Sequence, residues 1–306
     1  MSGSTKRVLI TGIHGFTGQY LKSELLRYGH HVYGLGIHDL DEPGYFKADL
    51  SDPRSLARAV DNIRPQWVAH LAAISFVGHG NPNDFYKINL MGTRNLLEAL
   101  ARKAQPPECV LLAGSANIYG NVHGVIREGT PANPANDYAV SKLAMEYMAA
   151  LWKPKLPLVI TRPFNYTGVG QSTDFLLPKI AAHFREKAPV IELGNLEVSR
   201  DFSDVRVIAH AYRRLLEERP SGEIINICSG RATSLKKILG IAESITGHRI
   251  EVRVNPSFIR KNEIKSLWGD PGKLRSIIGQ WDPLPLEDTL GWMLLGSNEQ
   301  GVLSNE

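Results

Sequence analysis

Residues 7–18 read Arg7-Val-Leu-Ile-Thr-Gly-Ile-His-Gly-Phe-Thr-Gly18, an apolar run of β type that ends in glycines at positions 12, 15 and 18. An amphipathic segment, Tyr20–Tyr28, follows. A strand, a glycine-rich turn and a helix in this order are typical of dinucleotide-binding sites. Glycine allows a tight turn and lets a pyrophosphate approach the positive end of the helix dipole. The spacing is GxxGxxG rather than GxGxxG, and we expect Gly12, Gly15 and Gly18 to bind a nucleotide, although a purely structural turn would use the same residues.

The rest of the chain alternates strand-like and helical segments. Short apolar runs predict strands at His31–Leu35, Gln66–Leu71, Cys109–Ala113, Leu158–Thr161 and Glu223–Ile227. Apolar residues at helical spacing predict helices at Asn89–Lys103, Tyr138–Leu151, Phe175–Lys187, Val205–Glu218 and Ser234–Thr246. This alternation indicates βαβ units and a parallel sheet covered on both faces. The expected fold class is α/β: a Rossmann-type, doubly wound parallel sheet with a smaller, mixed α/β C-terminal substrate domain.

The regular alternation stops after Pro163, and the last part of the chain is rich in proline and glycine. We expect residues 1–163 to form the dinucleotide-binding domain, to which residues 196–228 return with the strand at 223–227. Residues 164–195 and 229–306 are then the smaller domain, which would bind the substrate.

The composition argues against several classes of protein. The 306 residues include 35 basic and 31 acidic side chains, a net charge of +4, without a basic block interleaved with aromatic residues. No run approaches the ~20 apolar residues that a membrane helix needs, and the N-terminus lacks the apolar segment of a signal peptide. Cys109 and Cys228 lie in apolar runs and are expected to be buried thiols rather than metal ligands. We expect a cytoplasmic protein with no metal site, no nucleic-acid partner and no membrane association.

The segment after the second predicted strand bears on the choice of cofactor. A carboxylate at the end of this strand suits the 2′-hydroxyl of NAD, whereas its absence removes repulsion against the 2′-phosphate of NADP. Gly36 stands where the carboxylate is expected, which favours NADP(H), while Asp39 keeps NAD(H) as the alternative. Asp49 and Leu50 follow a short strand-like segment and fit a contact with the adenine, although the polar pair after them would cap a helix equally well.

A serine, a tyrosine and a lysine form a second motif. Tyr138 and Lys142 are four residues apart at the start of a predicted helix, so their side chains share one helical face. A phenol has a pKa of about 10, which the positive charges of the lysine and of an oxidised nicotinamide would lower for acid–base catalysis. Ser115 follows the strand Cys109–Ala113, at the ligand-facing end of a parallel sheet, and can hydrogen-bond a substrate carbonyl beside Tyr138. YxxxK alone would fit an ordinary helix surface, but together with the glycine loop and Ser115 it predicts an active site.

These motifs resemble those of the extended short-chain dehydrogenases/reductases that act on nucleotide sugars. The similarity spans nearly the whole chain and includes the segments His70–Ala73, Asn89–Thr93, Arg162–Asn165, Arg200–Val205 and Gly269–Pro283. It implies the family's fold, a dinucleotide cofactor, a homodimer formed through a helix bundle, and Ser115, Tyr138 and Lys142 as the catalytic residues. The expected cofactor contacts are then Gly12, Gly15, Phe16, Thr17, Gly18, Asp49, Leu50, Leu71, Ala72, Ala73, Tyr138, Lys142 and Pro163.

Dehydratases, epimerases, decarboxylases and 4-keto reductases share this scaffold. In related dehydratases a glutamate stands two residues before the tyrosine of the strand-end motif. Asn117 takes that place here, and an amide cannot exchange a proton as a carboxylate does. The segments Asn165–Phe175 and Glu197–Phe202 are most similar to GDP-6-deoxy-D-mannose reductases and GDP-mannose 4,6-dehydratases. The resemblance implies reduction of the C4 ketone of GDP-4-dehydro-6-deoxy-D-mannose to GDP-D-rhamnose with NADPH, or with NADH.

The substrate contacts that the resemblance implies are Ser115, Asn117, Asn165, Arg200, Arg260 and Glu263. Guanidinium groups suit the paired oxygens of a diphosphate, so Arg200 and Arg260 are the candidates for that contact, with Glu263 on the guanosine side. Surface ion pairing would explain Arg260 nearly as well. The alternative activity is a nucleotide-sugar 4-epimerase that keeps a tightly bound NAD and consumes none. A cofactor sensor without activity would not need Ser115, Tyr138 and Lys142.

Overall fold

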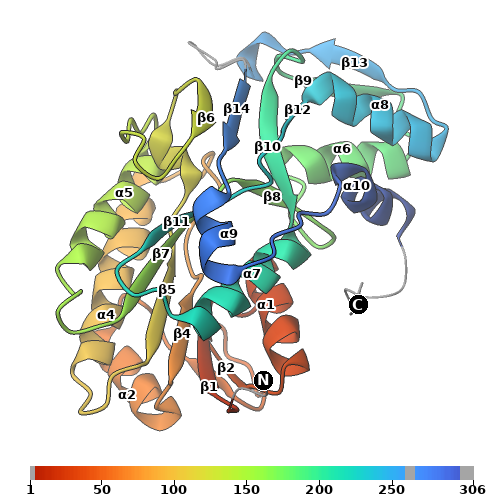
Figure 1. Cartoon of the computed structure of the whole chain (residues 1–306). Helices are drawn as coiled ribbons and strands as arrows, with labels where there is room; N and C mark the ends of the chain where they lie inside the picture. Colours follow the sequence, from red (N-terminus) through yellow and green to blue (C-terminus); the bar gives the residue numbers. More distant parts are fainter. Residues whose placement is uncertain (1–3, 259–265, 297–306) are drawn as a thin grey trace.

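A seven-stranded parallel sheet forms the centre of the structure (Figure 1). The computed structural model describes residues 4–258 and 266–296. The strand order is β11-β7-β5-β4-β1-β2-β3, so the chain starts in the middle of the sheet, runs to one edge and returns to fill the other side. The connections that leave β1 and β4 therefore run in opposite directions. This is the switch point at which α/β sheets bind ligands.

The strands of the large sheet are β1 (Arg7–Thr11), β2 (His31–Gly36), β3 (Tyr45–Lys47), β4 (Trp67–His70), β5 (Cys109–Ala113), β7 (Leu158–Pro163) and β11 (Ile224–Ile227). The helices around it are α1 (Phe16–Arg27), α2 (Pro53–Ile63), α3 (Pro82–Asp84), the π-helix η1 (Phe85–Gly92), α4 (Thr93–Ala101), the 3-10 helix η2 (Ala116–Tyr119), α5 (Asp137–Ala150), α7 (Val205–Glu218) and α9 (Gly272–Ile278). None of the helices in the described part of the chain is long and apolar enough to cross a membrane.

Helices cover both faces of the large sheet. Successive residues of a strand point to opposite faces, so Val8 and Ile10 share a core with α1, α7 and α9, whereas Leu9 shares one with α2, α4 and α5. Figure 1 shows α4 and α5 together on one side of the sheet and α7 and α9 on the other. Cys109 and Cys228 are buried and free, as the sequence predicted. The expected doubly wound α/β sheet is confirmed.

Smaller sheets and three helices form the other part of the molecule. The mixed sheet contains β12 (Ala232–Ser234), β10 (Ser199–Asp204), β14 (Ser266–Gly269) and β6 (Gly124–Ile126), with β8 (Asn165–Thr167) beside β10. A parallel pair consists of β9 (Val190–Leu193) and β13 (Glu251–Val254), and a 3-10 turn, η3 (Pro256–Phe258), follows. One apolar core joins α6 (Leu176–Arg185), α8 (Leu235–Thr246) and α10 (Leu286–Leu295).

Two buried aspartates connect the mixed sheet to distant segments. The carboxylate of Asp201 accepts hydrogen bonds from the Ser229 hydroxyl and from three backbone N–H groups, in the turn after β11 and in β14, at 2.7–3.2 Å. The carboxylate of Asp204 caps α7 and also accepts a hydrogen bond from Thr289 of α10 at 2.8 Å. Burial disfavours a charged carboxylate, and these donors compensate for the lost water.

The predicted elements agree well with the structure, and their ends differ most. The strand Cys109–Ala113 and the helix Val205–Glu218 have the predicted bounds. Helix α1 begins at Phe16, ahead of the predicted segment, because it starts directly at the glycine loop. The helix predicted at 89–103 starts earlier in the structure. Its helical segment begins with α3, continues through the π-helix η1 and ends with α4.

The chain also contains elements that the sequence did not predict. Helix α10 and the short strands of the mixed sheet were not expected, and α2 corresponds to the alternative in which the polar pair after Leu50 caps a helix. The strand predicted at 223–227 lies beside β7 at the edge of the large sheet. In contrast, β10, inside the segment 196–228 expected to return to the first domain, belongs to the mixed sheet.

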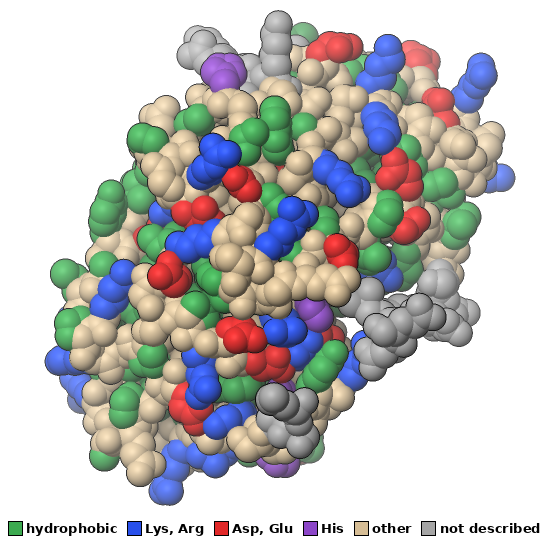
Figure 2. Space-filling view, viewed as in Figure 1, with side chains coloured by type: hydrophobic (Ala, Val, Ile, Leu, Met, Phe, Trp, Pro, Cys, Tyr) green, Lys and Arg blue, Asp and Glu red, His purple; other side chains and the backbone are tan. Residues whose placement is uncertain are grey.

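Charges of both signs are spread over the surface. Figure 2 shows basic and acidic side chains interspersed over one face of the molecule. Ion pairs such as Lys6–Glu108 at 2.8 Å and Lys273–Glu223 at 2.7 Å join several of them. Exposed pairs of this kind contribute little to stability, about 0–1 kcal/mol each.

Helix ends provide a stability test. Arg64 (φ 49°) and Gly247 (φ 66°) occupy the same left-handed position at the ends of α2 and α8. An L side chain costs about 1–2 kcal/mol in this conformation, and the larger freedom of glycine in the unfolded chain offsets part of that cost. We expect Arg64→Gly to raise the free energy of unfolding by about 0.5–1 kcal/mol and Gly247→Ala to lower it by a similar amount, as measured by urea denaturation. A Cβ at Gly247 meets open space, so an unchanged stability there would contradict the conformational explanation.

Candidate active site

The glycine loop joins β1 to α1 at the switch point of the sheet. Gly12 has φ 71°, and a Cβ on it would lie 2.9 Å from the Cα of Ala72. A Cβ on Gly18 would lie 2.3 Å from the carbonyl oxygen of Gly12, so the turn requires glycine. Helix α1 begins after Gly15 with no side-chain cap and no acidic residue in its first turn. Its uncapped N–H groups and the positive end of its dipole fit the diphosphate of a dinucleotide.

Other predicted cofactor residues surround this loop. The backbone N–H groups of Leu71 and Ala72 donate to the carbonyl and the hydroxyl oxygen of Thr11, at 3.3 and 3.1 Å. These bonds hold the segment Leu71–Ala73 beside the glycine loop. On the other side, the ring of Phe16 stacks on Tyr166, and the hydroxyl of Thr17 is 2.8 Å from the hydroxyl of the same tyrosine.

The remaining cofactor candidates lie at the ends of neighbouring strands. Pro163 is the last residue of β7. Asp49 accepts a hydrogen bond from the backbone N–H of Ser51 at 2.7 Å, and Leu50 is buried against α4. The cap of α2 is Asp52, which accepts from the N–H two residues later. The contact of Asp49 and Leu50 with an adenine stays a prediction.

Ser115, Tyr138 and Lys142 are brought together at the end of β5. All three are buried, with 4–7% of their surfaces exposed. Tyr138 and Ser115 are joined by a hydrogen bond between their side chains. The Lys142 ammonium donates to the carbonyl oxygen of Ala113, the last residue of β5, at 2.7 Å. The motif predicted from spacing is therefore a physical cluster at the ligand-facing edge of the sheet.

Local sequence explains why α5 starts where the cluster needs it. The side chain of Asn136 accepts a hydrogen bond from the Ala139 N–H at 2.9 Å and caps the helix. Asp137 places a negative charge in the first turn, where the helix dipole favours it. Asp137 also accepts a hydrogen bond from Tyr86 of η1 at 2.7 Å, which ties the start of α5 to that helix.

Burial decides the charge states in this cluster. Burial raises the pKa of Tyr138 to about 12, and the hydrogen bond with Ser115 lowers it by less. Burial dominates because removing a phenolate from water is costly. The lowering expected from Lys142 together with an oxidised nicotinamide stays a prediction. Burial lowers the pKa of Lys142 to about 8, against the raising effect of Glu146. At neutral pH the site holds a protonated phenol beside a charged ammonium.

Ser115 is oriented by Asn117. Its hydroxyl oxygen accepts hydrogen bonds from the backbone N–H and the side-chain amide of Asn117, at 3.2 and 3.3 Å. Both lone pairs of the oxygen are then engaged, so Ser115 donates its proton toward Tyr138. Asn117 thus contacts Ser115, a residue predicted to bind the substrate, and it supplies no carboxylate at this position.

The other predicted substrate residues lie apart from this cluster in sequence. Asn165 opens β8 next to the end of β7, and its side-chain amide donates to the carbonyl oxygen of Asp201 at 3.2 Å. Arg200 lies on β10, the strand that pairs with β8, and donates to the carbonyl oxygen of Ser199 at 2.9 Å. Arg260 and Glu263 lie outside the described residues.

A buried histidine, which the sequence analysis did not assign to the site, supports the glycine loop. His70 lies between Thr11 and Thr93, with its two ring nitrogens 2.7 and 2.8 Å from their hydroxyls. The Thr93 hydroxyl donates to the carbonyl of Asn89, so the Nε2 of His70 donates to Thr93 and its Nδ1 accepts from Thr11. Burial, helped by the charge of Lys142, lowers the pKa of His70 to about 3. The neutral ring therefore bridges β1, β4 and α4.

A buried ion pair is the second feature that sequence reasoning missed. Glu146 of α5 and Arg162 of β7 are bonded to each other next to Lys142. The signal available was spacing, because Glu146 follows Lys142 by four residues, as Lys142 follows Tyr138.

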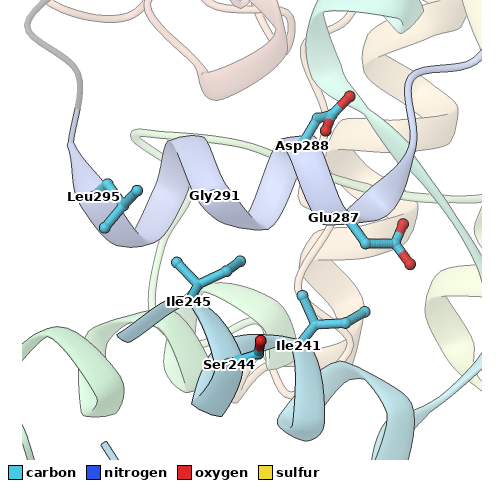
Figure 3. Close-up of a pocket in the computed structure, with 7 residues that line it drawn as sticks. All are labelled: Ile241, Ser244, Ile245, Glu287, Asp288, Gly291 and Leu295. Carbon is cyan, nitrogen blue, oxygen red and sulfur yellow. The ribbon is translucent and has the colours of Figure 1, made fainter. Parts of the chain in front are cut away.

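A groove of about 350 Å³ lies between α8 and α10. Figure 3 shows Ile241 and Ile245 extending from α8 toward α10, with Glu287 and Leu295 on the facing helix. None of the predicted site residues that the structure describes lines this groove, and we assign it no part in the site. Within residues 4–258 and 266–296, no three His, Cys, Asp or Glu side chains are grouped to hold a metal ion.

The sequence matches the GDP-mannose 4,6 dehydratase family over residues 9–289. The chain belongs to this family. It is therefore an extended short-chain dehydrogenase/reductase, as the resemblance implied, and a member of an oxidoreductase family. The buried serine, tyrosine and lysine of this family member stand at the edge of the sheet where its glycine loop lies.

Two curated relatives and two solved structures are similar over almost their full lengths. GDP-6-deoxy-D-talose 4-dehydrogenase of Aggregatibacter actinomycetemcomitans is 33% identical, covering 89% of this chain and 91% of the relative. GDP-6-deoxy-D-mannose reductase of Pseudomonas aeruginosa is 31% identical, covering 91% and 92%. One solved structure is a Burkholderia cenocepacia protein provisionally described as an epimerase. It has a TM-score of 0.89 at 48% identity, covering 96% of this chain and 98% of that protein. The structure of RMD from Pseudomonas aeruginosa complexed with NADPH has a TM-score of 0.85 at 30% identity, covering 95% and 98%.

The buried His70 predicts a pH-dependent stability. Its pKa in the folded state is depressed below the value of about 6.5 in an unfolded chain, so the unfolded state takes up a proton first as the pH falls. The stabilisation by neutral His70 is fully present above about pH 6.5. Below that pH, the free energy of unfolding falls by about 1.4 kcal/mol per pH unit because of His70. We expect His70→Gln to flatten the fall in the free energy of unfolding between pH 6.5 and 4.5, measured by urea denaturation. Equal slopes for the two proteins would contradict a neutral, buried His70.

Proposed function

We propose that this protein is a 4-keto reductase that converts GDP-4-dehydro-6-deoxy-D-mannose to GDP-D-rhamnose with NADPH. One observation carries the proposal: the buried cluster of Ser115, Tyr138 and Lys142 can protonate an alkoxide, and position 117 supplies no carboxylate for a dehydration. The names of both curated relatives concern GDP-6-deoxy sugars, which supports the nucleotide and the class of sugar.

Each residue of the cluster has a separate role in the proposed reduction. A bound dihydronicotinamide supplies the hydride, and the N–H groups at Phe16–Gly18 hold the diphosphate. Lys142 orients the nicotinamide ribose. Tyr138 is protonated at neutral pH and donates its proton to the C4 oxygen as negative charge develops there. When substrate is bound, Ser115 donates its proton to the same oxygen, because its lone pairs are occupied by Asn117.

NADPH is proposed over NADH on the charges at the end of β2. Lys47 of β3 is the register partner of Gly36, and its ammonium pairs with Asp39 at 2.8 Å. A positive charge thus lies near the strand end where a 2′-phosphate is recognised, and the nearby carboxylate is neutralised. The complex of RMD with NADPH supports the same choice. NADH is the alternative cofactor.

Asn165 and Arg200 are proposed to bind the GDP-sugar from the mixed sheet. The two residues lie on the paired strands β8 and β10, and β8 begins two residues after the end of β7. A guanidinium group at Arg200 suits the diphosphate. The contacts of Arg260 and Glu263 stay predictions. So do the division of the chain at 163, 196 and 228, the cytoplasmic location and the lack of nucleic-acid and membrane partners.

The test is NADPH absorbance on mixing the purified protein with GDP-4-dehydro-6-deoxy-D-mannose, with the product identified by NMR. Stoichiometric oxidation that yields GDP-D-rhamnose is expected. Oxidation that yields the C4 epimer, GDP-6-deoxy-D-talose, would retain the reductase but overturn the stereochemistry. Formation of a 4,6-dehydration product from GDP-mannose would overturn the argument from Asn117.

A nucleotide-sugar 4-epimerase is the second candidate. It is favoured by the 48% identity to the Burkholderia cenocepacia protein provisionally described as an epimerase. Such an enzyme would purify with NAD and consume no cofactor. Release of NAD on denaturation, together with no oxidation of NADPH, would decide for it.

Tyr138→Phe tests the proton donor. Loss of the hydroxyl removes the proton, and we expect kcat to fall at least about 100-fold while the dissociation constant for NADPH is retained. Tyr28→Phe is the control, because Tyr28 lies at the end of α1 and is 43% exposed. Turnover by Tyr138→Phe at the rate of the control would rule out this acid.

A homodimer through a helix bundle is proposed on the exposed apolar residues of η1 and α5 and on the residue that follows α5. Met91, Val140, Tyr147 and Leu151 are exposed, the last of them to 79%. Side chains of this size leave an apolar surface that a second copy would cover. Figure 1 shows α5 at the outside of the large sheet.

Leu151→Asp tests this interface. A carboxylate buried between two apolar surfaces is unfavourable, so we expect the dimer dissociation constant to rise at least about tenfold, measured by light scattering after size exclusion. Leu295→Asp, at an exposed leucine on α10, serves as control. A dimer that both variants leave intact would place the interface elsewhere.

A further inference from the structure

Helix α5 carries three buried polar side chains in one row. Tyr138, Lys142 and Glu146 follow each other at intervals of four residues, so they lie on one face. Glu146 is only 5% exposed. A carboxylate at this depth is unfavourable unless charge and hydrogen bonds compensate for the lost water. The first two residues belong to the proposed reaction, and the third has had no role.

Arg162 supplies the compensating charge from the neighbouring sheet. Its Nε donates to the two carboxylate oxygens of Glu146 at 3.1 and 3.2 Å, and its Nη2 donates to Oε2 at 2.6 Å. This arrangement uses the fork of the guanidinium and therefore fixes the plane of the carboxylate as well as its charge. Replacement by a lysine would keep only the charge.

Arg162 is itself held on its remaining side. Its Nη1 donates to the hydroxyl of Tyr119 at 2.8 Å and to the carbonyl oxygen of Glu128 at 3.1 Å. The guanidinium lies over the ring of Tyr119, and the tyrosine hydroxyl donates to Asn226 of β11 at 2.7 Å. Arg162 of β7 is therefore anchored to η2 and to the segment of Glu128 directly, and to β11 through Tyr119, so the ion pair cannot reorient freely.

The Glu146 carboxylate packs directly against the strand end that carries the active site. A Cβ on Gly114 would lie 2.9 Å from Oε1 of Glu146 and 2.6 Å from the carbonyl oxygen of Thr161. Gly114 stands between Ala113, which accepts the Lys142 hydrogen bond, and Ser115. The glycine thus leaves room for a negative charge beside the backbone on which the cluster rests.

Few charged groups compete for Lys142. His70 on β4 is neutral above about pH 3, and its pKa responds to the charge of Lys142. Tyr119 on η2 and Arg162 on β7 are bonded to each other, and Arg162 is bonded to Glu146. Among the described residues, no hydrogen bond joins either of them to Lys142. On η1, Tyr86 is bonded to Asp137 at the start of α5. Burial opposes the charge of Lys142, and the negative charge of Glu146 favours it.

We propose that Glu146, oriented by Arg162, is a positioning residue that keeps Lys142 charged and in place for the nicotinamide ribose. The inference rests on the proposed function, because it gives Glu146 a role in the same site. The proposal predicts the direction in which the pKa of Lys142 moves, whereas a merely structural ion pair predicts no direction. Removing the negative partner and removing the positive partner break the same contact, but they change the charge near Lys142 in opposite directions.

The test follows the titration of Lys142 directly in the full-length protein without substrate. The protein is labelled with ¹³C at the lysine Cε, and Lys142→Arg identifies the signal. In Glu146→Gln we expect the midpoint to fall by about one to three pH units, because an opposite charge one helical turn away is lost. In Arg162→Met we expect it to rise above that of the native protein, because the Glu146 charge is then uncompensated.

Midpoints that are unchanged in Glu146→Gln, or that move in the same direction in both variants, would overturn the proposal. Arg162→Met leaves a buried charge without a partner, and circular dichroism checks that it folds. If it does not fold, Glu146→Gln is compared with Glu146→Asp, which keeps the charge. The midpoint then falls in the first variant and stays near the native value in the second, and equal midpoints overturn the proposal.

Cofactor binding provides a second readout. The dissociation constant for NADPH, measured by fluorescence, is expected to rise with pH as Lys142 loses its proton, and to do so at lower pH in Glu146→Gln. A Glu146→Gln profile that superimposes on the native one would overturn the proposal. An enzyme that reduces no GDP-sugar but shows the opposite shifts of Lys142 would refute the proposed function and retain this inference.

Discussion

The close approach of four backbone segments at one edge of the large sheet is the constraint on which the site depends. Gly12 lies against Ala72, Gly18 against Gly12, and Gly114 against Thr161. In each pair a Cβ would come within 3 Å of backbone atoms, so the ends of β1, β4, β5 and β7 can meet only if these glycines have no side chain. The cofactor loop and the catalytic cluster are thereby brought to one edge of the sheet.

Burial then sets the chemistry of the polar groups at this edge. The same low-dielectric surroundings raise the pKa of Tyr138, lower that of Lys142 and keep His70 neutral. A protonated phenol suits proton donation in a reduction. A lysine whose charge is opposed by burial is helped by a nearby negative group, and the charge of Glu146 on the same helix acts in this direction. The ion pair with Arg162 is costly to bury, so its place beside the cluster is more readily explained by chemistry than by stability.

The mixed sheet is joined to this edge by short connections. β8 follows β7 after a single residue and pairs with β10, while Asp201 and Asp204 bind segments that are far apart in the sequence. The proposed substrate residues Asn165 and Arg200 are carried by this sheet. The proposed substrate residues are therefore held by the same hydrogen bonds that join the two parts of the protein.

Local patterns in the sequence were sufficient to predict the glycine loop, the alternation of strands and helices, and the pairing of Tyr138 with Lys142. Each depends on residues within a few positions of one another, so periodicity and spacing report it. Apart from β10, the strands of the mixed sheet have only three or four residues and are too short for periodicity, and the six residues of β10 are mostly polar. The π-helix η1 has no local signal. The direction of the Tyr138 pKa, the Asn117–Ser115 bonds and the Glu146–Arg162 pair depend on burial and on contacts between segments. Only the tertiary structure decides these, because desolvation and ion pairing act through space rather than along the chain.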